Sequence, residues 1–423
     1  MLLAAFVFRL AMTPKIYNGD LLSQADWGEY VAYRGPLNLY AHNVWVFYWP
    51  NHPPLTNLYY GFCFDVFKQI SLRLHQSVLV FNKIGLNYGL YFDFVKSFDL
   101  RVSPGVPFSL GYMLCLKLFP VIADILIGLI IYLLAVKNNK NGYKYLLLYL
   151  LLPFSWYISA LWGQTDQLAF LFVFVAFLLV LKHPFWSIIL FFVGGSIKPT
   201  SVFLIPLYLF ILYRTKPKFI YIFFGLLICF LLNYFIFIAF TDEGYIKFTF
   251  ERLLPRLFDK PLRLTTNSFN FWHIFVLQKN VASDVNIFIF SGKVWAMILL
   301  TALNIFTFVK IKLNNIKSIV FGMFVISFGS WLFATEMLDR YAFAGIASGL
   351  VLSIYYPKIL KYWLMLSFIF WLNLFRGWWY PSQLHLLQEL LEWKNYSAGL
   401  ILGLINIMIY FKIVWVIIND KND

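Results

Sequence analysis

Long apolar windows recur along the whole chain and constrain its fold more than any other feature. A transmembrane helix needs about 20 apolar residues to cross about 30 Å of hydrocarbon. Because 61% of the 423 residues are hydrophobic and only 13% are charged, a soluble globular fold is excluded. We therefore expect an all-α polytopic membrane protein. The predicted spans are 113–136, 145–161, 166–181, 219–240, 286–309, 316–335, 340–356, 359–376 and 398–418.

Two further apolar stretches do not fit a simple span. The stretch 185–213 is interrupted at 194–199, where a proline stops a helix and Lys198 would otherwise stand at mid-membrane. It predicts two short helices, each rising about 20 Å, that leave Lys198 in a dent reaching into the membrane. The N-terminal run 1–12 is short for a span and carries Arg9, and no small-residue cleavage site of a signal peptide follows it.

The distribution of charge predicts the orientation. With the N-terminus inside and about 11–12 segments, the inner loops 137–144, 182–184, 214–218, 310–317 and 357–361 hold twelve Lys and Arg and no acid, whereas the outer segments hold 16 of the 19 acids. This is the pattern of the positive-inside rule. The net charge of +15 therefore reflects topology, and we expect no nucleic-acid partner.

The largest predicted outer segments are 13–112, 241–285 and 377–397, and short outer turns between spans hold the remaining outer acids. In the first of them, Pro53-Pro54 opens a stretch with apolar residues at helical spacing, which predicts an amphipathic helix at the membrane interface. Pro381 opens a second helix of the same kind in the last outer segment. The three cysteines are far apart and support neither a disulfide framework nor a zinc site.

Polar groups near the outer rim are candidates for function because burying them near lipid costs free energy. Asp20, Asp26 and Glu29 follow the first apolar run, and a carboxylate held there is a candidate general base; the alternative is a solvated loop. His52 is the titratable residue of the Trp49–Leu55 motif, in which the prolines favour a structural role.

Two more clusters point to a sugar and to an anion. Gln164 and Asp166 offer hydrogen bonds to sugar hydroxyls beside the stacking face of Trp162, although a polar helix-hairpin turn would look the same. Lys198 must meet an anion, for which a phosphate and a salt bridge to Asp166 are the two candidates.

The fifth cluster is Asp339, Arg340 and Tyr341, in a tight outer turn between two spans. Arg340 could clamp a second phosphate oxygen, or the Asp339–Arg340 turn could satisfy itself. Additional positive charge in 241–285 comes from arginines that could equally contact lipid headgroups: Arg252, Arg256 and Arg263. Together the five clusters predict a site for an anionic lipid, where a carboxylate activates an acceptor hydroxyl and cations stabilise a departing phosphate.

At these residues the chain resembles the integral-membrane GT-C glycosyltransferases, in the mannosyltransferase-like branch related to GPI mannosyltransferase II. Three positions depart from the family pattern, namely His52, Thr200 and Leu338-Asp339, and they bear on the sugar rather than on the fold. The matching residues, in chain order, are Asp20, Trp27, Gly35 with Tyr40, His52-Pro53-Pro54-Leu55, Lys117 to Asp124, Trp162-Gly163-Gln164-Thr165-Asp166, Lys198-Pro199-Thr200, Asn267 to Trp272 and Leu338-Asp339-Arg340-Tyr341.

The resemblance implies a GT-C-like bundle and an inverting transfer of a hexose, such as mannose, from a polyprenyl- or dolichyl-phosphate donor. It implies Asp20 as the base, with Asp26 as the second choice, and a catalytic module at 1–240 followed by an outer loop 241–285 and C-terminal helices at 286–423. The acceptor would be a glycan, lipid or protein at the extracytoplasmic face, at the plasma membrane of a prokaryote or in the ER lumen of a eukaryote. Some members need a divalent metal, Mg or Mn, which the resemblance leaves open here.

Two other classes stay in view. An O-antigen polymerase or ligase also uses outer-face arginines on lipid-linked substrates, but it does not need an early Asp in a long first loop. A transporter or flippase of lipid-linked sugars would place its charges near the bilayer midplane and often carries inverted repeats, neither of which the sequence contains.

Overall fold

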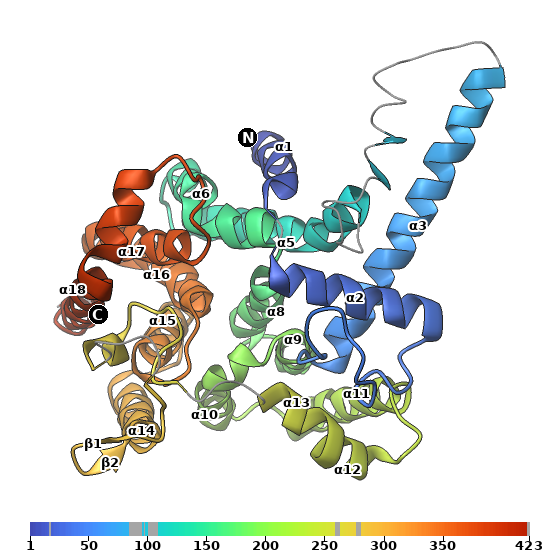
Figure 1. The fold of residues 1–423 in the computed structure, drawn as a ribbon. Helices are drawn as coiled ribbons and strands as arrows, with labels where there is room; N and C mark the ends of the chain where they lie inside the picture. The colour runs from blue at the N-terminus through green and yellow to red at the C-terminus, as the bar shows by residue number, and fades with distance from the viewer. Residues whose placement is uncertain are drawn as a thin grey trace.

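The computed structural model describes residues 1–16, 18–83, 95–96, 98–99, 109–258, 263–275 and 281–420, and of 79–83 and 393–397 only the backbone. The predicted outer loops 13–112 and 241–285 therefore lie partly outside the described residues. The described chain is mainly helical (Figure 1). Six helices are long and apolar enough to cross a membrane, which fits the predicted all-α, multi-pass protein. They are α5 (Leu110–Lys137), α11 (Phe219–Ile238), α14 (Gly292–Lys310), α15 (Ile316–Phe333), Pro357–Trp378 with η7 (Pro357–Ile359) and α17 (Leu360–Trp378), and Ala398–Ile418 within α18 (His385–Ile418).

Several other predicted spans are shorter or broken. The window 145–161 contains α6 (Gly142–Leu151) and a second segment, Pro153–Trp162, that bends away by 51° because Pro153 cannot donate the next helical hydrogen bond. The windows 166–181 and 340–356 become α8 (Asp166–Leu179) and α16 (Phe343–Tyr355), with 14 and 13 residues. These helices are too short to cross about 30 Å of hydrocarbon unaided.

The predicted break in 185–213 is confirmed. Helix α9 (Pro184–Ile197) ends before Lys198, whose backbone is extended, and η3 (Pro199–Leu204) with α10 (Ile205–Thr215) follows. Pro199 has no N–H to donate, so the helix cannot continue through this point. Lys198 is therefore carried at a gap between two short apolar helices.

Two helices occupy the start of the predicted first outer loop. Helix α2 (Gly19–Arg34) begins at Asn18, whose side chain accepts a hydrogen bond of 2.8 Å from the N–H of Leu21. Helix α3 (Pro54–Lys83) begins at the predicted proline pair and extends well away from the bundle (Figure 1). The two helices pack closely at Gly28, where a Cβ would lie only 2.6 Å from the carbonyl oxygen of Tyr60.

The remaining described elements between the long helices include short helical pieces and a pair of strands. Residues 245–258 form three short pieces, α12 (Tyr245–Lys247), η4 (Phe248–Leu253) and α13 (Leu254–Phe258), and an antiparallel pair, β1 (Asn286–Ile287) with β2 (Phe290–Ser291), precedes α14.

The long helices differ in how much of their surface is buried. In its most apolar window, 83% of α15 is buried, whereas the corresponding share for α11 is 11%. Helix α15 is thus central, and α11 presents its apolar side chains outward for lipid to cover.

A charged pair holds the N-terminal helix α1 (Leu2–Met12) inside the bundle. Arg9 and Asp124 are both fully buried, and Arg9 Nε donates to Asp124 Oδ2 over 2.6 Å. Arg9 also donates to the carbonyl of Leu150 and to Ser155, at the bend between α6 and Pro153–Trp162. Tyr149 and Ser159 donate to the two oxygens of Asp124, so both charges have full hydrogen-bonding shells.

An irregular segment around η5 (Phe271–Ile274) enters the bundle and is held by asparagines. The side chain of Asn373 accepts from the N–H of Phe269 and donates to the carbonyl of Asn267, and Asn406 donates to the carbonyl of Phe269. Buried backbone groups outside regular structure need such partners. This segment supports the turn after α15, because Ser268 donates to the carbonyl of Met337 over 2.6 Å.

Candidate functional site

Four separate parts of the chain bring charged side chains together at one place. Asp20 comes from the first turn of α2, Asp166 from the start of α8, Lys198 from the gap after α9, and Arg340 from η6 (Asp339–Ala342). Gln164 precedes Asp166 in the turn 163–165. We call these five residues, together with Asp339 and Tyr341, the rim cluster.

Arg340 is the centre of the rim cluster. Its Nη2 donates to Asp20 Oδ2 over 3.1 Å, and its Nε lies 3.9 Å from Asp166 Oδ2. The guanidinium carbon lies 5.8 Å from the ring centre of Trp162 and 5.6 Å from that of Tyr341. Its Nε is buried and has no hydrogen-bond acceptor among the described residues. A guanidinium carries more donors than this arrangement uses, so it has room for another acceptor.

Lys198 forms a buried ion pair with Asp166. The two side chains are 3% and 6% exposed, and Lys198 Nζ donates to Asp166 Oδ2. Of the two partners that the sequence left open for Lys198, the structure gives the salt bridge to Asp166. Lys198 Nζ also lies 5.7 Å from the ring centre of Tyr341, so Arg340 and Lys198 face the same ring.

Asp20 is the most accessible acid of the cluster, with 42% of its side chain exposed. Gln164 Nε2 donates to Asp20 Oδ2 over 3.1 Å, which is the oxygen that Arg340 also uses. No hydrogen bond from the described residues is recorded at the other oxygen, Oδ1. That oxygen can therefore accept a hydrogen bond from a further group.

Asp339 lies behind Arg340 and is buried. Burial is the main reason that the pKa of its carboxyl rises from the usual 3.8 to about 7, and the negative charges of Asp20 and Asp166 also raise it. The positive charge and the backbone N–H of Arg340 act in the opposite direction. Its Oδ1 accepts from the N–H of Arg340 over 2.8 Å, which fixes the start of η6. The predicted self-satisfied turn is therefore present in the backbone, while the side chain of Arg340 points to other partners.

Two residues hold the turn before α8 in place, and neither was predicted from the sequence as a site residue. Gly163 has a φ of +68°, a conformation that favours glycine, and a Cβ there would lie 2.6 Å from Lys117. Lys117 is fully buried in α5 and donates to the carbonyls of Thr13, Ile16 and Leu161 over 2.6–2.7 Å. A lysine at position 117, within an otherwise apolar window, is the sequence signal from which this structural role could have been predicted.

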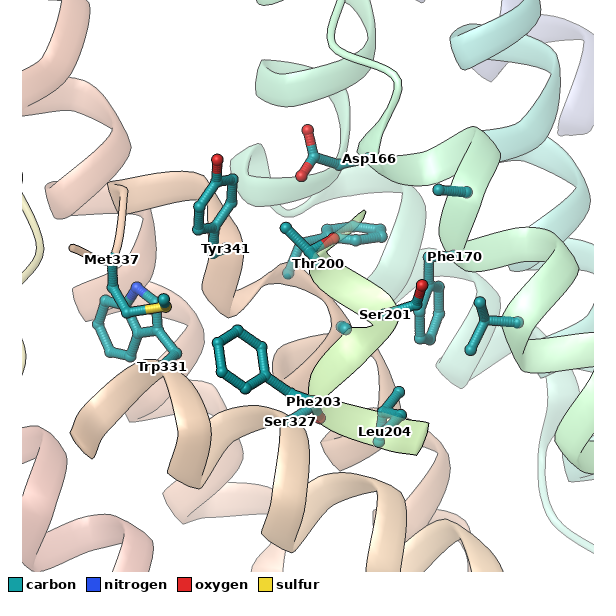
Figure 2. A pocket seen from close by; sticks show the side chains of 14 residues that line it. Asp166, Phe170, Thr200, Ser201, Phe203, Leu204, Ser327, Trp331, Met337 and Tyr341 are labelled. Atoms are coloured by element: carbon teal, nitrogen blue, oxygen red, sulfur yellow. The ribbon is translucent and has the colours of Figure 1, made fainter. Parts of the chain in front are cut away.

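An apolar pocket opens beside the rim cluster (Figure 2). Asp166 and Tyr341 lie at one end of it, and Phe203, Leu204 and Trp331 line the opposite part. It lies between α8, η3, α15 and the start of α16. The pocket therefore joins a charged end to an apolar body, which suits an amphiphilic molecule.

Three predicted site residues lie outside the cluster. Asp26 is six residues beyond Asp20, about 9 Å along α2, and its Oδ2 accepts from the N–H of Val46 over 2.8 Å. Burial raises the pKa of Asp26, and this hydrogen bond opposes the rise. His52 packs against Trp27 at 5.4 Å between ring centres. Glu29 lies three residues beyond Asp26 on α2, on the side of Tyr112.

The arginines of the 241–285 loop do not join the cluster. Arg252 pairs with Glu243 over 2.9 Å, and Arg256 donates to Asn43 over 2.7 Å. Arg263 pairs through its backbone with Ala282.

Across the described ranges, no three His, Cys, Asp or Glu side chains lie close enough together to hold a metal ion.

Comparison with models of known protein families gives no match, and comparison with curated proteins gives none either.

Proposed function

We propose that this protein is a membrane glycosyltransferase of the GT-C type. In this proposal it moves a hexose from a polyprenyl- or dolichyl-phosphate donor to an acceptor hydroxyl at the extracytoplasmic face, with inversion. The observation that carries the proposal is the rim cluster, in which the accessible carboxylate of Asp20 pairs with Arg340, and Arg340 in turn lies next to the buried Lys198–Asp166 pair. A base next to an anion-binding group is the arrangement that glycosyl transfer from a phosphate needs.

The proposed reaction needs one proton acceptor and one stabilised leaving group. Asp20 Oδ1 takes the proton from the acceptor hydroxyl while that oxygen forms a bond to the anomeric carbon. The bond from the anomeric carbon to the phosphate oxygen breaks, and its electron pair leaves with the lipid phosphate. Arg340 and Lys198 stabilise the charge that develops on that phosphate, and Asp20 later gives its proton to water.

The pocket beside the cluster supports the lipid part of the proposal. Its end at Asp166 and Tyr341 adjoins Lys198 and Arg340, which would hold the phosphate, and its apolar part would cover the start of the donor's isoprenoid chain (Figure 2). An exposed apolar chain gains roughly 25 cal/mol for each Å² that it buries. Binding energy of this kind can position the sugar next to Asp20.

The test is transfer of radiolabelled sugar from a panel of polyprenyl-phosphate sugars in membranes that carry wild-type protein, Asp20→Asn or Asp26→Asn. We expect Asp20→Asn to lose about 100-fold or more of the transfer rate, as is typical when a general base is removed. Asp26→Asn is the matched control on the same helix and should keep most of the rate, because Asp26 holds the backbone of Val46. A wild type that transfers nothing from any donor would contradict the proposal and favour a transporter.

A further inference from the structure

The two ion pairs of the rim cluster differ in how easily they can be broken. The Lys198–Asp166 pair is 3% and 6% exposed, and breaking a buried pair leaves an uncompensated charge in a poorly solvated place. The Arg340–Asp20 pair is 12% and 42% exposed, and exposed pairs are weak because water and salt screen them. A phosphate that reaches the cluster will therefore displace Asp20 from Arg340 before it displaces Asp166 from Lys198.

We infer that Arg340 exchanges partners during the reaction: it holds Asp20 while the site is empty and transfers to the donor phosphate when the donor binds. This inference rests on the proposed function and adds an order of events to it. Arg340 is suited to the exchange because its guanidinium carbon lies 5.8 Å and 5.6 Å from the ring centres of Trp162 and Tyr341, whose attraction for a cation persists while its N–H groups change acceptors.

The exchange determines when the carboxylate of Asp20 is released to act as the proton acceptor. While the site is empty, Arg340 donates to Asp20 Oδ2 over 3.1 Å and holds the carboxylate against the guanidinium. Gln164 donates to the same oxygen over 3.1 Å and keeps Asp20 in place after Arg340 has left. Asp20 is thus released from Arg340 only when a phosphate occupies Arg340, so the donor binds before the carboxylate is turned over to the acceptor hydroxyl.

A double-mutant cycle on ligand binding tests the exchange. The probe is geranylgeranyl phosphate, which carries no sugar, and its equilibrium binding is measured with the purified full chain in nanodiscs at one fixed pH. The variants are wild type, Asp20→Asn, Arg340→Gln and the double variant. Asp26→Asn and Arg252→Gln serve as matched controls, because both lie outside the rim cluster.

The exchange predicts that Asp20→Asn binds the probe about two- to fivefold more tightly than wild type, because Arg340 no longer has to leave a partly exposed ion pair. The gain must vanish in the Arg340→Gln background, where no competition exists. An equal gain in both backgrounds would reflect simple charge repulsion and would overturn the exchange, and so would a loss of affinity in Asp20→Asn. If Arg340→Gln does not fold, Arg340→Met replaces it, since a methionine keeps an unbranched side chain for packing and has no charge to pair with Asp20.

Two further arms identify the ligand and separate this inference from the proposed function. Inorganic phosphate that competes as well as the lipid would support the exchange and assign it to free phosphate, whereas competition by geranylgeraniol alone would overturn it. If the probe binds but the gain from Asp20→Asn is missing, or persists in the Arg340→Gln background, the exchange is overturned and the glycosyltransferase proposal is unaffected. A wild type that binds neither phosphate nor lipid phosphate overturns both.

Discussion

Among the described residues, arginine and aspartate form ion pairs at two places, and the surroundings of the two pairs are different. Around Arg9 and Asp124, two backbone carbonyls, two serines and a tyrosine complete the hydrogen bonding, and both residues are fully buried. Around Arg340 and Asp20, one buried nitrogen has no acceptor among the described residues and the carboxylate is 42% exposed. A complete shell indicates a structural pair, whereas an incomplete shell leaves bonds for a ligand.

The largest effect should come from breaking the structural pair. Arg9→Leu leaves Asp124 buried without a counter-charge, which should cost about 3–5 kcal/mol and prevent stable folding. Thermal unfolding in detergent measures this. The double variant Arg9→Leu with Asp124→Leu removes both charges and should recover much of the stability. A single variant as stable as wild type would show that the two arginine sites do not differ as described.

Removing a cation from the rim cluster should affect binding more than folding. Lys198→Gln leaves Asp166 with Arg340 at 3.9 Å as a remaining counter-charge, so the free energy of unfolding should fall by less than the roughly 3–5 kcal/mol expected for Arg9→Leu. Affinity for geranylgeranyl phosphate should fall about 10- to 100-fold, since hydrogen bonds to charged groups contribute about 1.5–3 kcal/mol. Equal losses of stability and affinity would make Lys198 a structural residue like Arg9.

The buried acid of the rim cluster predicts a pH dependence. Asp339 has a pKa of about 7, so it is neutral below that pH and adds a negative charge above it, with Asp20, Asp166, Arg340, Arg376 and Tyr157 as its charged or titratable neighbours. Affinity for an anion should therefore fall about fivefold as the pH rises through 7, which corresponds to ~1 kcal/mol for one nearby charge.

The probe for this measurement is the methyl ester of geranylgeranyl phosphate, whose single charge does not change in this range. Asp339→Asn should make the affinity independent of pH near 7. Stability gives a second readout, because the raised pKa lowers the free energy of unfolding as the pH rises from about 4 to about 7. A wild-type affinity that stays constant across pH 7 would contradict the assignment.

The smallest effect belongs to a third arginine pair, on the surface. Arg252 and Glu243 are 41% and 27% exposed and lie 2.9 Å apart. Water screens such a pair, so Arg252→Gln should change neither the melting temperature nor probe binding measurably. A clear loss in either measurement would mean that distance alone, and not the surroundings, decides what an arginine pair does.

The parts of the fold that depend on local chemistry could be predicted from the sequence. Pro199 placed the helix break and Lys198 beside it, Pro54 placed the start of α3, and the Trp162–Asp166 turn was recognised from its polar residues. Asp20 was assigned to a loop, but it lies in the first turn of α2. Asn18 at the N-cap was the local signal for that helix.

The long-range contacts could not be predicted in this way. Nothing local connects Arg9 with Asp124, which are 115 residues apart, or Arg340 with Asp20, which are 320 apart. The choice between a phosphate and Asp166 as the partner of Lys198 also depends on how α8 and α9 pack. Periodicity indicates which face of a helix is buried but does not identify the residue opposite it.

The pair of Arg9 and Asp124 also implies an order of events during synthesis of the protein. An arginine at the centre of an isolated membrane helix costs about 2.5–3.5 kcal/mol on insertion scales. Its partners Asp124 and Ser155 leave the ribosome 115 and 146 residues later, which takes roughly 7–30 s at about 5–20 residues per second. Until then α1 lacks the contacts that hold it in the bundle. Its final position is therefore reached after the chain has been made past Ser155.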